Sequence, residues 1–451
     1  MTRRALLLTG LVVACTLVVG GVVGYVLVRE GAEDCGIPTE HVDTAPAAFV
    51  ERDALVPAGT VGEERRPVVD AADRLPPPFG PVVAGRFYGT EERVPQLVAV
   101  DGDVVLAEPP RRTGSPASLQ RVTLPDGAVT WDRTFTGGPS SGGPVGDLFV
   151  TAVGGSDPTI LTVEAPSGEL VGCVPAPAAA EDTDTTLLTD QAAADVVIAA
   201  TQVGSATILS RVDPAQGEVR WDVSLPGPGE IGGVTSGPDL AVVSRVGHDP
   251  VKLAELAAAG GIERPMVSAY SLDDGSPGWS YPADGEVAAT AAAVLETDSA
   301  SGETYVLAVR PNGTSRAVAL DPGGGTRWER DLGAGYWDGD LWGDLLVMQG
   351  PDPQGGAVLK AFSATDGSPV WSLRSRDLPA PRRAAQRFGP SATLGDQVVM
   401  TAPGGLVLVD PATGEATPVR TSLGVDQVLP VGHHLVLRAG TALLVLTVAG
   451  A

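Results

Sequence analysis

Few residues in this chain have the type and spacing that catalysis requires. Of the four histidines, His41 and His248 are isolated, and His433 and His434 are adjacent at the start of a predicted strand. Adjacent strand residues face opposite sides, so these two cannot act on one group. The segment 137–143 is rich in glycine, but the lysine and helix of a phosphate-binding loop do not follow it. With no recognisable triad, the sequence predicts no catalytic residues.

Metal and nucleic-acid sites are not predicted either. The densest acidic stretch, Glu181 to Asp184, lacks the glycine and the distal glutamate of a calcium loop. The formal net charge of −25 argues against nucleic acid, which needs a basic face. We therefore expect no metal, no cofactor and no nucleic-acid partner.

The chain has three cysteines, and two of them are expected outside the membrane. Cys15 lies in an apolar run near the N-terminus, whereas Cys35 and Cys173 come later. Disulfides persist outside the cytoplasm, so we hypothesise a bond between Cys35 and Cys173. The alternative is two unrelated cysteines, with Cys173 acting as a small apolar strand residue.

The N-terminus predicts a membrane anchor. Arg3 and Arg4 precede an uninterrupted apolar run over residues 5–28, which acidic residues follow. A helix of that length measures about 36 Å, enough to cross a hydrocarbon core of roughly 30 Å. The basic residues before it predict that residues 1–4 are cytoplasmic and that the bulk of the chain is extracytoplasmic.

Two alternatives to this signal-anchor remain open. The residues that end at Cys15 resemble the lipobox of bacterial lipoproteins, although apolar residues continue after it. The pair Arg3-Arg4 faintly resembles a twin-arginine signal, which would be cleaved. After the run, residues 29–81 show little periodicity and many prolines, among them the run at 76–78. We interpret them as an extracytoplasmic linker.

A glycine recurs along the rest of the chain four residues before a tryptophan. Successive glycines lie 41 to 58 residues apart, and strand-like segments separate them. A period in the forties with short strands is typical of a propeller whose blades are four-stranded sheets. Two degenerate copies, at Gly168 and Gly414, fit the same frame. The five complete pairs are Gly127 with Trp131, Gly217 with Trp221, Gly275 with Trp279, Gly324 with Trp328, and Gly367 with Trp371.

These pairs predict the contacts that hold the blades together. Aspartate, proline and glycine in front of each tryptophan favour a tight turn, in which glycine takes a positive φ. The tryptophan then emerges on the outer strand, where it can cover the seam between neighbouring blades and bury on the order of 150–250 Å². Stacking of blades buries both faces of each sheet, which no isolated blade could do.

A count of strands predicts eight blades, with a seven-bladed ring as the alternative. A strand pair near residues 434–445 follows the seventh turn and leaves an eighth blade one strand short. We expect the segment near Val82 to Tyr88 to supply the missing outer strand and so to close the ring. The propeller then spans residues 82–449.

The repeat units resemble those of the pyrroloquinoline-quinone-type propellers. Asp213 to Trp221 is the fullest copy, and the resemblance covers roughly residues 82–449. It implies an eight-bladed ring. The family includes quinone-dependent dehydrogenases and non-catalytic scaffolds similar to the outer-membrane assembly propeller of Gram-negative bacteria. The scarcity of lysine relative to arginine is typical of GC-rich genomes, such as those of actinobacteria.

The residues of the family's dehydrogenases are not found in this chain. The resemblance implies that such enzymes carry adjacent cysteines over the quinone and a calcium bound partly by asparagine. This chain has no adjacent cysteines, and its one asparagine, Asn312, lies in a Pro-Asn-Gly sequence typical of a hairpin turn. No Cys-x-x-Cys-His haem site occurs. We therefore expect no quinone cofactor.

Two departures from the repeat are candidate sites for a partner. The fourth blade carries an insertion in which residues 251–259, with Leu253 and Leu256, predict a short helix. The second departure is an aromatic segment with Tyr336, Trp337 and Trp342. Loops on a rigid scaffold often carry function, but an insertion or aromatic residues that pack on their own blades are the alternative.

The sequence favours a membrane-anchored, extracytoplasmic propeller that binds or scaffolds an unknown protein without catalysis. A sensor that binds a small ligand in the propeller channel is the second hypothesis. A quinone-dependent dehydrogenase is the third.

Overall fold

The computed structural model describes the strands of a closed ring. The described residues are 39–42, 47–56, 64–88, 94–108, 117–135, 139–153, 159–175, 185–189, 197–203, 206–225, 233–245, 255, 259, 266–282, 289, 291–378, 391–402 and 405–448. The predicted membrane segment, residues 5–28, lies outside them. Within the described part, no helix is both long enough and apolar enough to cross a bilayer.

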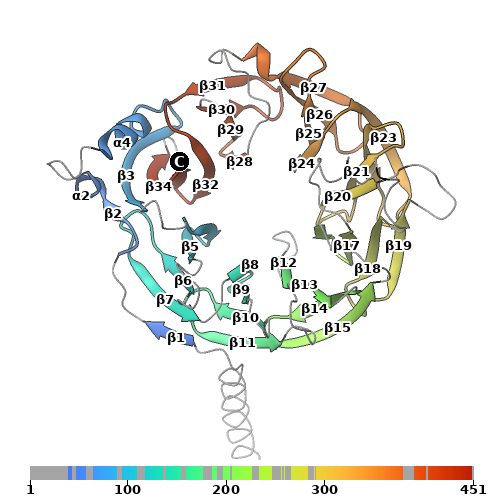
Figure 1. Cartoon of the computed structure of the whole chain (residues 1–451), viewed down its shortest axis with the longest axis horizontal. Coiled ribbons are helices and arrows are strands. Elements are labelled where there is room, and N and C mark those ends of the chain that lie inside the picture. The colour runs from blue at the N-terminus through green and yellow to red at the C-terminus, as the bar shows by residue number, and fades with distance from the viewer. Residues whose placement is uncertain are drawn as a thin grey trace, which may run out of the picture.

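The described strands form eight antiparallel sheets arranged around a central axis, as Figure 1 shows. The fold is therefore an all-β, eight-bladed propeller, as the sequence predicts. From inner to outer strand, blade 1 is β4 (Gln96–Val100), β5 (Asp103–Glu108), β6 (Ala117–Val122) and β7 (Val129–Phe135), and blade 2 is β8 (Pro139–Val145), β9 (Leu148–Val153), β10 (Thr159–Glu164) and β11 (Leu170–Pro175). Blade 3 is β12 (Thr185–Thr189), β13 (Val197–Val203), β14 (Ala206–Asp213) and β15 (Glu218–Leu225), and blade 4 is β16 (Gly233–Ser236), β17 (Leu240–Ser244), β18 (Val267–Ser271) and β19 (Pro277–Tyr281).

The second half of the ring repeats this order. Blade 5 is β20 (Ala291–Thr297), β21 (Thr304–Val309), β22 (Thr314–Leu320) and β23 (Thr326–Ala334), and blade 6 is β24 (Asp338–Trp342), β25 (Leu345–Pro351), β26 (Ala357–Ser363) and β27 (Pro369–Arg374). Blade 7 is β28 (Ser391–Leu394), β29 (Gln397–Ala402), β30 (Gly405–Val409) and β31 (Ala416–Arg420), and blade 8 is β32 (Val425–Val431), β33 (His434–Ala439), β34 (Ala442–Val448) and β3 (Phe79–Phe87).

Blade 8 closes the ring with strands from both ends of the chain. Strand β3 pairs antiparallel with β34, so that Ala84 lies opposite Val445 and Phe87 opposite Ala442. This pairing confirms the prediction that an early segment supplies the outer strand of blade 8. Because the ends of the chain hydrogen-bond to each other, the ring cannot open without breaking a sheet.

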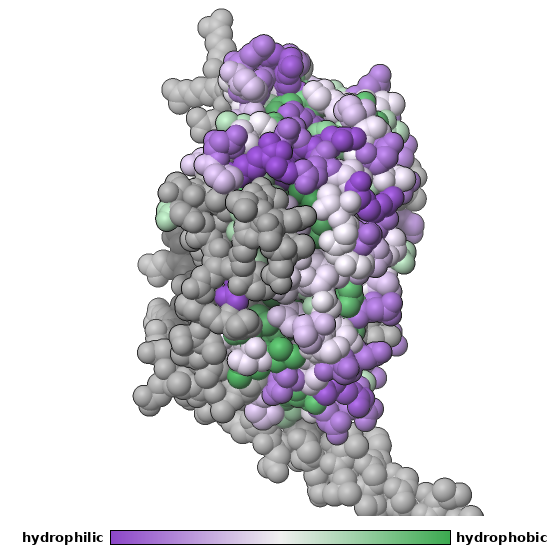
Figure 2. All heavy atoms as spheres, turned by 90° about the vertical axis from the view of Figure 1, so that its right-hand side faces the viewer, coloured by the Kyte–Doolittle hydropathy of each residue, from purple (hydrophilic) through white to green (hydrophobic). Residues whose placement is uncertain are grey.

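The strand sequences match their depth in each blade. The middle strands are buried on both faces; all six side chains of β21, for example, are buried. The outer strands alternate, and β15 buries Trp221 and Leu225 while most of its other side chains face solvent. Continuous apolar runs suit strands covered on both faces, whereas alternation suits a strand at the rim. Hydrophilic residues accordingly cover much of the rim in Figure 2.

The interpretation of residues 29–81 as a linker is wrong for much of that stretch. Strand β1 (Thr39–Val42) pairs with the outer strand of blade 1, and β2 (Val50–Glu51) pairs with that of blade 8. The helices α2 (Arg52–Leu55) and α4 (Arg66–Ala72) bury Leu55, Val69 and Ala72 in a cluster with blades 7 and 8. Short apolar clusters between the prolines give this stretch its packing, although they are too brief to produce a periodic pattern.

Asp73 fixes the position of these N-terminal elements. Its Oδ2 accepts a hydrogen bond of 2.7 Å from Nη2 of Arg52 on α2. Its Oδ1 accepts one of 2.8 Å from the backbone amide of Val82 on β3. One carboxylate at the end of α4 therefore ties both helices to the closing strand.

The ring has two unlike faces. The turns between the first and second strands of a blade, and between the third and fourth, lie on one side, which we call the turn face. The connections between the second and third strands, and those from one blade to the next, lie on the other side, which we call the loop face. The two longest connections within and between the four-stranded blades, residues 245–266 and 375–390, both belong to the loop face.

Candidate interaction surface

The repeated tryptophans lie at the seams between blades, near the turn face. Each indole ring packs against a glycine in a turn of the next blade, so the partner is the glycine of the following repeat. An added Cβ would lie less than 3.0 Å from the ring, and all five partner glycines have positive φ. The pairs are Trp131 with Gly168, Trp221 with Gly275, Trp279 with Gly324, Trp328 with Gly367, and Trp371 with Gly414.

Most of these indoles also donate a hydrogen bond across the seam. The acceptor is the backbone carbonyl three residues before the partner glycine, a contact that the sequence analysis missed. A buried indole N–H that lacks a partner costs free energy, so this bond fixes the ring's orientation. The bonds run from Nε1 of Trp131 to Ala165 (2.9 Å), of Trp221 to Leu272 (2.8 Å), of Trp328 to Ala364 (2.9 Å), and of Trp371 to Pro411 (2.8 Å).

Arginines reinforce two seams beside the tryptophans. Arg133 and Arg330 each follow a docked tryptophan by two residues and donate to the carbonyl of its partner glycine. Arg133 is only 6% exposed, and burial lowers the pKa of its guanidinium. The pattern Trp-x-Arg, present at Trp131 and Trp328, is a sequence signal that could have revealed this contact.

Trp279 departs from this pattern because its partner turn is tighter. In blade 5, the amide of Gly324 donates to the carbonyl of Asp321, three residues earlier. The amide of Gly367 in blade 6 instead donates to the carbonyl of Ser363, four residues earlier. The carbonyl of Ala364 is therefore free to accept from Trp328. The Nε1 of Trp279 is buried and has no partner in the described part of the chain.

Three of the eight seams lack a docked tryptophan, and at two of them other residues make the contact. At the seam of blades 2 and 3, an added Cβ on Gly217 would lie 3.6 Å from both Gly172 and Cys173, so backbone packs on backbone. At the seam of blades 8 and 1, Phe49 takes the place of the tryptophan. An added Cβ on Gly127 would lie 2.6 Å from the Cβ of Phe49. Phe49 is fully buried, and the amide of Ala48 donates to the Gly127 carbonyl. The N-terminal segment thus supplies the contact at the seam of blades 8 and 1.

Cys173, on β11, is disulfide-bonded. The other cysteines, Cys15 and Cys35, lie outside the described residues. The pairing with Cys35 therefore stays a prediction.

The predicted aromatic partner site forms only in part. Trp337 is 2% exposed and packs against Gly350, so it cannot meet a partner as the sequence analysis expected. Trp342 is half-buried, and its ring centroid lies 6.3 Å from that of Trp371. Tyr336, at 46%, is the most exposed of the three. The ring of Trp337 packs between blades 5 and 6 and that of Trp342 between blades 6 and 7, because burial of apolar area is favourable.

Lys360 accounts for the position of Trp337. Its Nζ lies 4.5 Å from the centroid of the Trp337 ring and donates to the carbonyl of Leu332 at 2.9 Å. Burial lowers the pKa of Lys360. The lysine is therefore a structural cation across the seam of blades 5 and 6.

The insertion in blade 4 lies largely outside the described residues, and Leu253 and Leu256 are among those left out. Two of its residues are described. Glu255 is helical, and the amide of Ala259 donates to its carbonyl at 3.0 Å. Both residues are exposed.

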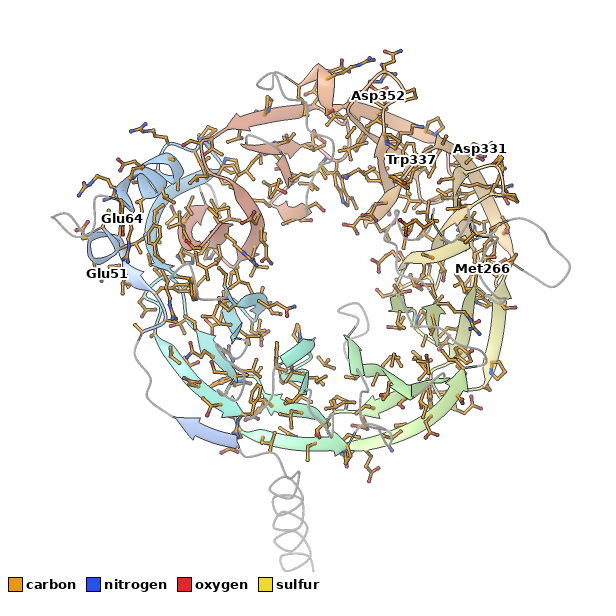
Figure 3. All side chains as sticks on the ribbon, viewed as in Figure 1. Glu51, Glu64, Met266, Asp331, Trp337 and Asp352 are labelled. Atoms are coloured by element: carbon orange, nitrogen blue, oxygen red, sulfur yellow. The ribbon has the colours of Figure 1, made fainter. Side chains whose placement is uncertain are left out.

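A charged cluster lies on the loop face of blade 6, on the connection that follows β25. The Asp352 side chain is 3% exposed, and its Oδ2 lies 3.4 Å from Nε of Arg376 and 3.8 Å from Nε of Arg374. Arg374 ends β27 and Arg376 belongs to the short 3-10 helix η1 (Ser375–Asp377). Figure 3 labels Asp352 and Trp337 on this blade. The buried carboxylate positions two arginines whose side chains are 44% and 31% exposed.

The remaining candidate groups do not form a reaction centre. Burial and the neighbouring His433 lower the pKa of His434. Asn312 lies in the hairpin between β21 and β22, where its Oδ1 accepts from the amide of Thr314 at 3.1 Å. Among the described residues, no group of three histidine, cysteine or acidic side chains could hold a metal ion.

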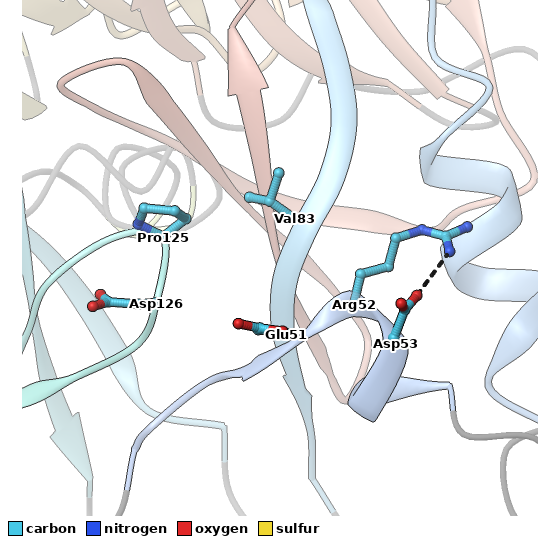
Figure 4. A pocket seen from close by; sticks show the side chains of 6 residues that line it. All are labelled: Glu51, Arg52, Asp53, Val83, Pro125 and Asp126. Carbon is cyan, nitrogen blue, oxygen red and sulfur yellow. Dashed lines mark ion pairs between the residues drawn. The ribbon is translucent and has the colours of Figure 1, made fainter.

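A shallow pocket of about 300 Å³ opens near the seam of blades 8 and 1. Its acidic side chains face solvent, and Asp53 is 98% exposed at 3.8 Å from Arg52 (Figure 4). The guanidinium of Arg52 is already bound to Asp73. The pocket is lined by Glu51, Arg52, Asp53, Val83, Pro125 and Asp126.

The geometry defines the class of protein: an eight-bladed β-propeller. Residues 263–422, from blade 4 to blade 7, match the family model described as outer membrane protein assembly factor BamB. None of the curated proteins matches the sequence significantly.

Solved structures share the fold at low sequence identity. The Dos1 propeller covers 84% of this chain and 97% of its own, with a TM-score of 0.53 and 11% identity. BamB from Moraxella catarrhalis covers 81% and 99%, with a TM-score of 0.46 and 13% identity. The quinohemoprotein alcohol dehydrogenase ADHIIG from Pseudomonas putida HK5 covers 81% and 76%, with a TM-score of 0.47 and 12% identity. Such likeness establishes the fold and not an activity.

Proposed function

We propose that this protein is a non-catalytic propeller that is anchored in the cytoplasmic membrane and binds another protein outside the cell's cytoplasm. The loop face is the binding surface. One observation carries the proposal: the two longest connections within and between blades leave this face, whereas the repeated tryptophan contacts lie at the other. Long loops on a rigid scaffold are where binding residues usually lie.

The surface chemistry of the loop face supports this proposal. Tyr336 is a large exposed side chain on the connection that leads from blade 5 into blade 6. Tyrosine is enriched at the centres of protein interfaces. The apolar run at residues 5–28 supports the anchoring.

Proximity labelling in the native envelope tests the binding. We expect the full-length chain to label a protein whose enrichment falls at least about tenfold in Tyr336→Asp, because interface anchors often contribute 2 kcal/mol or more. Val219→Asp is the matched control, since Val219 is 38% exposed at the turn-face end of blade 3. Equal enrichment for both variants and the wild type would contradict binding through the loop face.

A titration with the quinone tests the absence of catalysis. We expect pyrroloquinoline quinone and calcium to produce neither an absorbance change nor alcohol-dependent dye reduction. Turnover under these conditions would show that the protein is a dehydrogenase.

A further inference from the structure

Strand β1 fixes the side from which the N-terminal chain reaches the ring. It pairs antiparallel with β7, with Thr39 opposite Phe135 and Val42 opposite Asp132. Phe135 is the last residue of β7, from which the chain crosses to blade 2, so it lies at the loop face. The chain therefore enters β1 at the loop face and runs toward the turn face.

The length of chain before β1 limits how the ring can be oriented. Residues 29–38 separate the apolar run from β1, and ten residues reach at most about 36 Å. If Cys173 is bonded to Cys35, only residues 29–34 remain, which reach about 21 Å. Cys173 lies two residues before the loop-face end of β11.

If the disulfide forms, this reach is close to the height of the rim. Strand β15 has 8 residues, and at about 3.3 Å per residue it spans roughly 26 Å between the two faces. Since Cys173 lies two residues from the loop-face end of β11, almost all of a tether of about 21 Å would have to run back along the rim to put the turn face against a bilayer. Entry at the loop face therefore makes that face the nearer one when the tether runs directly to the bilayer.

Charge favours the same orientation. The Nε atoms of Arg374 and Arg376 face the buried Asp352, and a guanidinium has further N–H donors, at Nη1 and Nη2, that remain for other partners. Asp377, at 3.8 Å from Arg376, is 62% exposed and forms a weak surface pair. On the turn face, Asp274 and Asp366 are exposed, and hydrogen bonds within their turns lower the pKa of both carboxyl groups.

Tyr336 lies on the same part of the loop face as the arginines. An added Cβ on Gly335 would lie 2.4 Å from Pro351, so the segment before Tyr336 packs on the connection that contains Asp352. Tyrosine is enriched at the level of lipid headgroups, and arginine binds their phosphates with paired N–H groups.

We infer that the loop face is the side of the propeller that faces the membrane, and that Arg374 and Arg376 contact anionic phospholipid headgroups there. This inference rests on the anchoring in the proposed function. It adds an orientation and a lipid contact to it, and it restricts the protein partner to one that can reach the space between ring and bilayer.

Energy transfer from two matched labels to the bilayer tests the orientation. Gln354 and Gln216 are both exposed, and the backbone amide of each donates to Oδ1 of a preceding aspartate. They differ in position, because Gln354 lies on the loop face and Gln216 on the turn face. The full chain, in a Cys15→Ser background with Gln354→Cys or Gln216→Cys, carries a donor dye. It is placed in nanodiscs of phosphatidylcholine with phosphatidylglycerol and a trace of rhodamine lipid.

We expect transfer from position 354 to exceed that from position 216 by about twofold or more, since the two labels differ in height by roughly 26 Å. Equal transfer, or greater transfer from position 216, would overturn the orientation. A chain that does not enter the nanodiscs would overturn the anchoring itself, and with it this inference. The two failures are therefore distinguishable.

A second comparison tests the headgroup contact. Transfer from position 354 is expected to rise when phosphatidylglycerol replaces part of the phosphatidylcholine, and the double variant Arg374→Gln with Arg376→Gln is expected to lose that rise. Arg220→Gln is the matched control, because Arg220 is an exposed arginine that pairs with Asp213 on the turn face. If the double variant behaves as the wild type does, the headgroup contact is wrong.

Discussion

The turn face and the loop face of this propeller are built from the same strands but by different means. At the turn face, short turns present a glycine to the aromatic ring of the preceding blade, and the same contact recurs at five of the eight seams. At the loop face, the connections vary widely in length. The difference teaches that the free energy holding the blades together is concentrated on one face, which leaves the other free to vary and to bind.

The prediction with the largest expected effect concerns Phe49, the residue that the N-terminal segment contributes to the turn face. Phe49→Ala is expected to lower the free energy of unfolding by about 3–5 kcal/mol, because it empties a fully buried site at the seam of blades 8 and 1. Urea unfolding followed by tryptophan fluorescence measures it. Val50→Ala, next to it but 42% exposed, should change stability by less than about 0.5 kcal/mol. Equal effects would show that the N-terminal segment is not part of the closure.

A pair of glycine substitutions compares the two faces directly. Gly367 on the turn face has φ 67°, and its added Cβ would lie 2.6 Å from Trp328. Gly313 on the loop face has φ 74° and nothing within 4 Å. Both Ala variants carry a backbone strain of about 1 kcal/mol, and Gly367→Ala should lose a further 1–3 kcal/mol through the displaced ring. Similar losses in thermal unfolding would refute the concentration of stability at the turn face.

A smaller effect separates the indole hydrogen bond from the packing of the ring. Trp328 donates to Ala364 at 2.9 Å, whereas the Nε1 of Trp279 has no partner in the described structure. Trp328→Phe should therefore cost about 1 kcal/mol more than Trp279→Phe, the worth of one such bond. Denaturation of both variants under the same conditions gives the difference. A larger loss for Trp279→Phe would mean that its N–H is bonded.

The smallest effect is a pH dependence that belongs to the turn face. The backbone amide of Ser301 donates to Asp298 and lowers the pKa of its carboxyl group, and the amide of Ala300 acts in the same direction. Burial has the opposite effect but is outweighed. The folded pKa then lies below the unfolded one, so the ionised carboxylate stabilises the fold above about pH 4 and the contribution disappears as the pH falls.

Melting temperatures between pH 5 and pH 3 test this. Asp298→Asn keeps an acceptor oxygen but cannot titrate, so its loss of stability over this range should be smaller than that of the wild type. Asp366→Asn should act in the same direction, because turn hydrogen bonds also lower the pKa of Asp366. Identical pH profiles for all three proteins would contradict the assignment.

Much of the fold follows from local pattern. The spacing of the Gly-x-x-x-Trp units, and the strand pair left over after the seventh, are enough to predict eight blades closed by an early strand, because each turn needs its own glycine and each blade its own strands. The candidate site was predicted less well. The sequence suggests that Trp337 is a surface anchor. In the structure its ring is buried, because Gly350 has no side chain and leaves space for the indole.

The N-terminal segment shows a different limit. Its apolar residues, such as Phe49 and Val69, are separated by prolines and charges, so no period identifies their partners. Their burial depends on Gly127 and on blades 7 and 8, which are distant in sequence.

The sequence by itself determined the repeat, the number of blades and the end-to-end closure, because these depend on short-range turn chemistry and strand periodicity. The tertiary structure alone decided which glycine each tryptophan meets, which aromatic side chains stay exposed, and that residues 39–42, 47–56 and 64–78 pack on the ring. Those outcomes depend on contacts between residues far apart in the chain, and no local pattern encodes such contacts.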